Sequence, residues 1–154
     1  MKLRTIVVGV AMCLFSLTLC FAESSMMGTW KLNEAKSKIP EGAAKSVTVV
    51  YEPAGDSIKC TIDGVDGKGN PTHTEWTGKF DGKDYPVTGD SNQSTRSVKL
   101  INDRKMDVDV KKDGKVIMSG HIEIAADGKS RTVTLHGIDA MGKKVESKAV
   151  YDKQ

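Results

Sequence analysis

The sequence predicts an all-β protein, an antiparallel up-and-down β-barrel of about eight to ten strands. Short segments alternate between apolar and polar residues along most of the chain, which is the pattern of half-buried strands. Asp-Gly pairs and related turn signals recur about every ten residues, and Asp-Gly supplies the positive φ of tight hairpins. A sandwich would show the same alternation, but successive hairpins without a long crossover favour the barrel.

The first 22 residues have the features of a removable export signal. Met1–Arg4 is positively charged, the run from Thr5 to Cys20 is largely apolar and uncharged, and Ala22 is a small residue at the expected cleavage point. A retained anchor is disfavoured because this run is shorter than the about 20 residues that a spanning helix needs. Leu19 argues against a lipoprotein signal, which requires a small residue before the cysteine. We therefore expect a secreted or periplasmic protein.

Residues 23–154 are expected to form a single domain with its own core. They contain no Pro/Ser-rich linker and no block of like charge. Loss of Lys2 and Arg4 with the leader leaves a nearly neutral chain, against +3 for the whole sequence. Electrostatics therefore gives no reason to expect binding to nucleic acid or stable insertion into a membrane after the leader is removed. Cys60 is then the one remaining cysteine, which excludes an internal disulfide.

Ten strands follow from the alternation and the turn positions. The first, 28–32, precedes the one segment that favours a helix, 33–38, which Asn33 would cap and Pro40 would end. A short helix at this place would plug one end of the barrel. The remaining strands are expected at 45–52, 57–64, 72–80, 84–88, 94–101, 105–112, 115–125, 130–138 and 143–152.

The opening strand resembles that of a known superfamily. The segment Gly28-Thr29-Trp30-Lys31-Leu32 is similar to the first-strand Gly-x-Trp signature of the calycins, the lipocalins and fatty-acid-binding proteins. The chain also resembles small secreted bacterial lipocalin-like proteins in its Trp-x-Leu-Asn start and in the segments Gly82–Val87 and Val150–Gln154. The resemblance implies a calycin barrel in which Gly28 and Trp30 are structural, with Trp30 packed across the barrel bottom. The alternative is that Trp30 forms part of the wall of a ligand cavity.

Two departures separate the chain from fatty-acid-binding proteins. Those proteins hold the ligand carboxylate with an Arg-x-Tyr on the last strand, whereas the segment ending in Tyr151 keeps the tyrosine and lacks the arginine. They also carry a helix-turn-helix lid, and one short helix is expected here. The resemblance therefore implies the fold, while the function has to be argued from the site.

The barrel interior is the leading candidate site. Trp76, Met106, Met118 and Tyr151 have the parity of the apolar faces of their strands, so they would either line a pocket or fill a core. Arg96 shares its parity with the apolar residues that follow it and would point inward. A buried guanidinium needs a partner, and a ligand carboxylate would serve. The alternative places Arg96 near the barrel mouth with its head in water.

The sequence shows no convincing catalytic or metal-binding set. His73-x-Glu75 and His121-x-Glu123 each place an imidazole and a carboxylate on one strand face. Both pairs lie on the polar face, and two ligands fall short of a four-ligand metal site. Cys60 has apolar parity and no histidine on its strand, so it is interpreted as packing. We expect neither an enzyme nor a protein that depends on a cofactor.

The leading hypothesis is a secreted lipocalin-like protein that binds a small apolar or amphipathic ligand in a barrel cavity. The alternative is a packed barrel without a cavity, acting in the envelope or outside the cell as a protein-interaction module. A cavity of about 300 Å³ or more would favour the first hypothesis. A filled interior with an exposed apolar patch would favour the second. The expected ligand contacts are Trp76, Arg96, Met106, Met118 and Tyr151.

Overall fold

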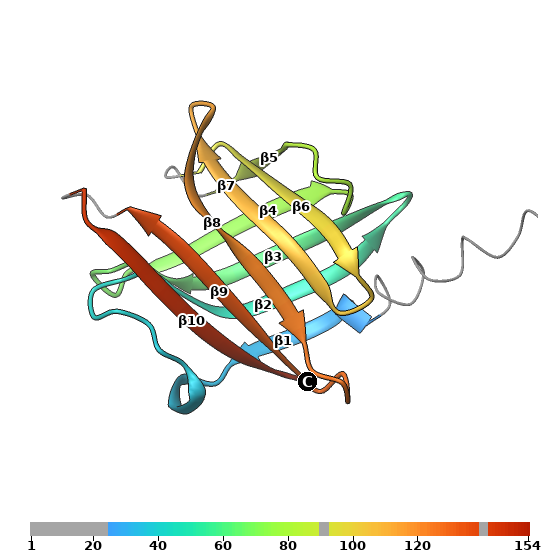
Figure 1. The fold of residues 1–154 in the computed structure, drawn as a ribbon, viewed down its shortest axis with the longest axis horizontal. Helices are drawn as coiled ribbons and strands as arrows, with labels where there is room; N and C mark the ends of the chain where they lie inside the picture. Colours follow the sequence, from blue (N-terminus) through green and yellow to red (C-terminus); the bar gives the residue numbers. More distant parts are fainter. Residues whose placement is uncertain (1–24, 90–92, 139–141) are drawn as a thin grey trace, which may run out of the picture.

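The computed structural model describes residues 25–89, 93–138 and 142–154, so the predicted leader lies outside the described residues. Ten strands form one closed antiparallel barrel, in which sequence neighbours pair and the first strand pairs with the last (Figure 1). This confirms the predicted barrel and excludes the sandwich. The strands are β1 (Gly28–Leu32), β2 (Lys45–Ala54), β3 (Ser57–Val65), β4 (Pro71–Gly78), β5 (Tyr85–Thr88), β6 (Thr95–Asn102), β7 (Lys105–Lys112), β8 (Lys115–Ile124), β9 (Ser130–Ile138) and β10 (Lys144–Lys153).

The fourth strand ends earlier than predicted, at Gly78 rather than Phe80. A Cβ atom at Gly78 would lie 2.6 Å from the rings of Trp76 and Tyr85, so these two aromatic side chains need a glycine between them. The chain then crosses towards β6, where the Leu100 N–H donates to the Phe80 carbonyl at 3.1 Å. Phe80 still enters the core and stacks on Trp76, with ring centres 6.4 Å apart.

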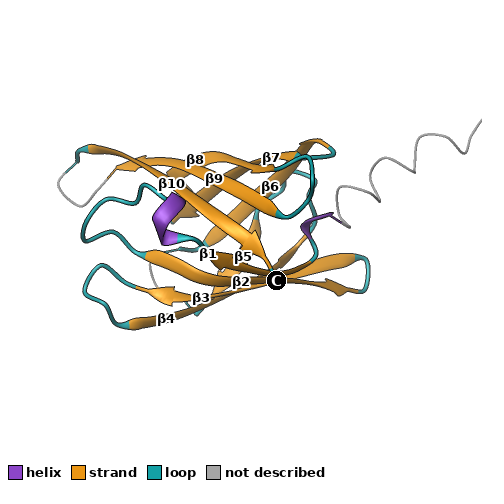
Figure 2. Cartoon of the chain, turned by 90° about the horizontal axis from the view of Figure 1, so that it is seen from below, coloured by secondary structure: helices purple, strands orange, loops and turns teal. Residues whose placement is uncertain are grey.

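The segment between β1 and β2 contains a single 3-10 turn, η1 (Glu34–Lys36), none of whose residues is buried. The expectation that it plugs the barrel is wrong. Asn33 donates its N–H to the Val150 carbonyl at 2.8 Å, and Lys38 pairs with Lys148, so this segment runs along β10 (Figure 2). Because η1 has no apolar face, burial inside the barrel would offer it no hydrophobic gain.

Packed side chains fill one end of the barrel, here called the closed end. This end holds the start of β1 and the turns that join β2 to β3, β6 to β7 and β8 to β9. The core extends from it through the middle of the barrel. Its largest fully buried side chains are Trp30, Trp76, Met26, Met106 and Cys60.

The opposite end, here called the pocket end, is less completely filled. It holds the turns that join β3 to β4 and β7 to β8, the last residues of β9 and the first residues of β10. Val133, Leu135 and Ala149 face inward on β9 and β10, yet they are only partly buried. No helix in the described part of the chain is long and apolar enough to cross a membrane.

Candidate functional site

A buried arginine that the sequence analysis did not single out closes one end of the barrel. Arg131 on β9 is 2% exposed. Its guanidinium carbon lies 4.8 Å from the Trp30 ring centre, 5.2 Å from that of Tyr51 and 4.9 Å from that of Tyr151. Its Nη1 also contacts the Met26 sulfur at 3.4 Å. Because aromatic faces attract a desolvated guanidinium, Arg131 serves the packing of the closed end.

Gly28 and Trp30, which were expected to be structural, lie at this same end. Trp30 is completely buried, and its Nε1 donates to the Met26 carbonyl at 2.8 Å. The ammonium of Lys153 lies 5.2 Å from the Trp30 ring centre on the β10 side. Gly28 adopts a φ of 102°, which favours glycine because a Cβ atom is strained there.

The second interior arginine, Arg96, lies nearer the pocket end. The register places it on the inner face, opposite Tyr85 on β5 and Val110 on β7. Its Nη2 donates to the Gln93 Oε1 at 2.9 Å, and its carbonyl accepts from the Trp76 Nε1 at 3.0 Å. Its Nε is buried without a hydrogen-bond partner among the described residues. Arg96 as a whole residue is half-buried.

The barrel interior is cationic. On the described strands, every charged residue at an inward-facing position is a lysine or an arginine. Arg96 and Arg131 lie inside, Lys153 is at the closed end, and Lys112 and its cross-strand partner Lys115 are at the exposed tips of β7 and β8. Lys153 is engaged, because its Nζ donates to the Ser25 carbonyl at 2.9 Å. With no aspartate or glutamate facing inward on these strands, the interior suits an anion.

The ionisable groups beside the two arginines do not supply a negative charge that would balance the guanidinium groups. Burial raises the pKa of Tyr51, of the Cys60 thiol and of Tyr151 above their ordinary values. The positive charges of Arg96 and Arg131 act against these shifts but do not overcome them. The three groups therefore stay neutral at physiological pH.

An open pocket of about 630 Å³ lies at the pocket end, between the β7–β8 and β9–β10 hairpins. Pairing between β8 and β9 stops at Met118 and Gly137, although β8 begins at Lys115 and β9 ends at Ile138. A register shift at Ile117 accompanies this separation, and such bulges bend and twist a strand. In Figure 1 the β7–β8 hairpin ends at the top of the view, and the end of β9 and the start of β10 lie at its left side.

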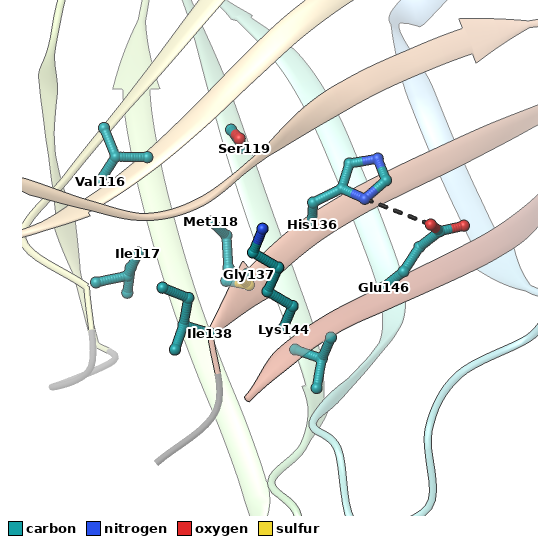
Figure 3. A pocket seen from close by; sticks show the side chains of 10 residues that line it. Val116, Ile117, Met118, Ser119, His136, Gly137, Ile138, Lys144 and Glu146 are labelled. Carbon is teal, nitrogen blue, oxygen red and sulfur yellow. Dashed lines mark ion pairs between the residues drawn. The ribbon is translucent and has the colours of Figure 1, made fainter. Parts of the chain in front are cut away.

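The lining of this pocket is apolar on one side and polar on the other (Figure 3). On the polar side, the His136 Nδ1 lies 3.5 Å from the Glu146 Oε2. At the back, Gly137 makes room for Met118, because a Cβ atom at Gly137 would lie 2.9 Å from the Met118 Cγ. The lining residues are Val116, Ile117, Met118, Ser119, His136, Gly137, Ile138, Lys144, Val145 and Glu146.

One cross-strand row of inward-facing residues joins Arg96 to this pocket. Arg96 lies opposite Val110, Val110 opposite Met118, Met118 opposite Gly137, and Gly137 opposite Val145. Neighbouring strands lie about 4.8 Å apart, so two strand spacings, roughly 10 Å along the wall, separate Arg96 from Met118. Arg96 and the pocket residues Met118, Gly137 and Val145 therefore lie on the same face of the sheet, and the Val110 side chain between them is 3% exposed.

The structure divides the five predicted ligand residues into two groups. Trp76, Met106 and Tyr151 are 2%, 0% and 4% exposed, so their side chains are in full contact with other core residues. Arg96 and Met118 lie in the row that reaches the pocket. Parity could have found Arg131, since it alternates with the inward residues of its strand as Arg96 does. The pocket itself depends on where pairing stops, and no sequence signal marked that position.

The two histidine–glutamate pairs noted in the sequence lie on the outer wall. The His73 Nδ1 lies 2.6 Å from the Asp63 Oδ1, and this hydrogen bond raises the pKa of His73. Glu75 pairs with Lys59 at 2.6 Å. Within residues 25–89, 93–138 and 142–154, no three histidine, cysteine or acidic side chains are grouped to hold a metal ion.

The comparisons with known proteins bear on the fold. No family model and no curated protein matches this chain. Among solved structures, EF1p2_mFAP2b bound to DFHBI is similar over 89% of this chain and 100% of its own, with 12% identity and a TM-score of 0.52. A redesigned β-barrel, b11L5F_LGL, is similar over 89% of this chain and 98% of its own, with 14% identity and a TM-score of 0.47. The first likeness supports the closed β-barrel fold.

Proposed function

We propose that this protein is an exported binding protein for a small amphipathic anion. The acidic group of the ligand binds Arg96, and its apolar part lies against the inner wall of the barrel. The observation that carries this proposal is the cationic interior, in which the Nε of Arg96 and that of Arg131 both lack a partner among the described residues and Arg96 is the less buried of the two. Hydrogen bonds to charged groups contribute about 1.5–3 kcal/mol each, so a carboxylate at Arg96 would bind favourably.

Two further observations support a ligand rather than a filled barrel. The pocket of about 630 Å³ falls within the range of about 300–1,000 Å³ that small-molecule sites occupy. EF1p2_mFAP2b was solved with DFHBI bound, so a small molecule is compatible with a barrel of this fold. Binding rather than catalysis is proposed because the sequence offers no nucleophile beside a base. Export rests on the predicted leader, and N-terminal sequencing of the protein from its own host would test cleavage near Ala22.

A protein-interaction surface is the second candidate, and one observation favours it. Val116 and Ile138 at the pocket lip are 53% and 64% exposed, and exposed apolar patches mark partner sites. Such a surface would use the outer lip and would not need Arg96. Variants of Arg96 therefore separate the two functions.

The test compares three ligands with the same alkyl chain and different heads: dodecanoate, dodecanol and dodecyltrimethylammonium, all below their micellar concentrations. Calorimetric titration of the full chain should show the tightest binding for dodecanoate. Arg96→Leu should weaken dodecanoate binding at least about tenfold and abolish the preference for the anion. Arg104→Leu, at an exposed arginine in the turn between β6 and β7, is the matched control and should bind as the unmodified chain does. Equal binding of the three heads, or no effect of Arg96→Leu, would overturn the proposal.

A further inference from the structure

We infer that the open pocket beside the β7–β8 hairpin binds an extended segment of another protein, in which apolar residues are flanked by acidic ones. The segment would add to the edge of β8 at the place where β9 has separated from it. This inference goes beyond the small-anion proposal and does not depend on Arg96. Arg96 does not line the pocket, and Val110, which lies between them, is 3% exposed.

The edge of β8 is open beside this pocket. Pairing between β8 and β9 ends at Met118 and Gly137, whereas β8 begins three residues earlier, at Lys115. Ile138 continues β9, but its one strand partner among the described residues is Lys144 on β10. An open strand edge can accept a further strand, because its unpaired N–H and C=O groups form hydrogen bonds with an extended peptide.

The geometry of the β7–β8 turn shows which backbone groups face that edge. Asp113 and Gly114 have φ values of 50° and 77°, and two positive φ values are typical of two-residue hairpin turns. Because the closing pair of such a turn, Lys112 and Lys115, exchanges backbone hydrogen bonds, the N–H and C=O of Val116 point away from β7. Within the described part of the chain, no backbone hydrogen bond reaches Val116 from that side. Val116 therefore offers one donor and one acceptor to an incoming strand.

Apolar side chains line both faces of the gap that this strand would fill. The side chains of an added strand alternate between the two faces of a sheet. On the outer face, Val116 and Ile138 are 53% and 64% exposed. On the inner face, Met118 and Val145 line the pocket, and Figure 3 shows Met118 at its back. Aliphatic residues in the added strand would remove these side chains from water, which is a main source of affinity.

The charges around the gap favour acidic residues at the ends of the added strand. Lys112, Lys115 and Lys144 are exposed, and none of them forms an ion pair with another described residue. The nearby carboxylates are Asp113, in the turn, and Glu146, whose Oε2 already lies 3.5 Å from an imidazole nitrogen. Unpaired positive charge therefore exceeds negative charge here, and an acidic partner is electrostatically complementary.

The same charges argue against a second copy of this chain as the partner. Two β8 edges that paired about a two-fold axis at Val116 would make the Lys115 side chains of the two copies diagonal neighbours on one face of the sheet. Like charges in that arrangement repel each other. The expected partner is therefore a different protein that supplies an acidic, extended segment.

Amide hydrogen exchange, measured by NMR on the full chain, gives the sharpest test. The probe is the capped peptide Asp-Thr-Ile-Thr-Val-Thr-Asp, whose apolar and acidic side chains share one face when it is extended. At saturation it should slow exchange of the Val116 amide at least about tenfold, because that N–H then donates to the peptide. The peptide with lysine in place of both aspartates should bind at least about tenfold more weakly. The acidic peptide N-methylated at its five central residues cannot form a strand ladder, so it should give no protection.

A charge reversal on the protein tests the same contact from the other side. Lys115→Glu combined with Lys144→Glu should make the lysine-flanked peptide the tighter ligand. Lys129→Glu, at an exposed lysine in the turn between β8 and β9, is the matched control and should keep the preference for the acidic peptide. The inference is overturned if the reversed variant keeps that preference or if no peptide protects the Val116 amide. Binding of phosphatidylglycerol vesicles in place of the peptides would also overturn it.

These outcomes are independent of the small-anion proposal. Both lysine variants should bind dodecanoate as the unmodified chain does, and Arg96→Leu should leave peptide binding unchanged. A failure of the peptide experiments would therefore reject the strand-edge site alone. Loss of the Arg96 dependence of dodecanoate binding would instead reject the small-anion proposal.

Discussion

At the closed end of the barrel, Trp30, Met26 and Arg131 contact one another and exclude water. At the pocket end, Met118, Gly137 and Val145 occupy equivalent inward positions but border an open pocket. Both ends are built from the same alternating strands. They differ in the size of the inward side chains and in whether β8 and β9 remain paired.

The difference indicates how one small barrel separates stability from binding. Large buried side chains contribute most of the hydrophobic free energy, and the fully buried ones include Trp30 and Met106. The pocket end, with smaller and partly exposed inward residues, contributes less to stability and leaves room for a ligand. The division predicts unequal effects of matched substitutions at the two ends.

The largest effect is expected from a matched pair of isoleucines on β3. Both face inward, but Ile58 is 5% exposed near the closed end, whereas Ile62 is only partly buried near the pocket end. Ile58→Ala should lower the free energy of unfolding by about 2–5 kcal/mol, and Ile62→Ala by less than about 2 kcal/mol. Urea unfolding followed by tryptophan fluorescence measures both. Equal losses would mean that the two ends are packed alike.

The reactivity of thiols should also differ between the packed core and the pocket end. Cys60 is 1% exposed, and burial raises the pKa of its thiol, so it should resist alkylation by iodoacetamide in the folded protein. A cysteine introduced as Met118→Cys should react at least about tenfold faster, because it borders the open pocket. Mass spectrometry of the peptides resolves the two sites. Faster labelling of Cys60 would contradict the packed core.

The smallest effect on stability is expected on the outer wall of the barrel, away from the packed and open ends of its interior. The hydrogen bond that the Asp63 carboxylate accepts from the His73 ring raises the pKa of His73. The pair therefore stabilises the fold below the unfolded-state pKa of histidine, and this contribution is lost as the pH rises through the higher folded-state pKa. Asp63→Asn should lower the pKa of His73 in an NMR titration and reduce stability slightly at acidic pH, since exposed pairs contribute little. It should leave dodecanoate binding unchanged, and a change would show that the wall and the interior are coupled.

Much of the candidate site could be anticipated from parity. Alternation placed Arg96 and Met118 on inward faces, and the register agrees. The same rule applied to β9 would have identified Arg131 as a second interior cation. Parity could not separate Trp76, which is packed in the core, from Met118, which borders the pocket, because both alternate in the same way. That distinction depends on which neighbours fill the space around each side chain.

The sequence by itself determined the all-β class, the antiparallel meander and nearly all of the strand positions, because a strand's period of two and its turn residues are local properties. The predicted helix illustrates the limit, since pairing with β10 placed the 33–38 segment outside the barrel. Only the tertiary structure decided that the barrel closes through β1 and β10, that Arg131 is enclosed by three rings, and that β8 and β9 separate beyond Met118 and Gly137. These features arise from contacts between residues far apart in the chain, and local alternation carries no information about them.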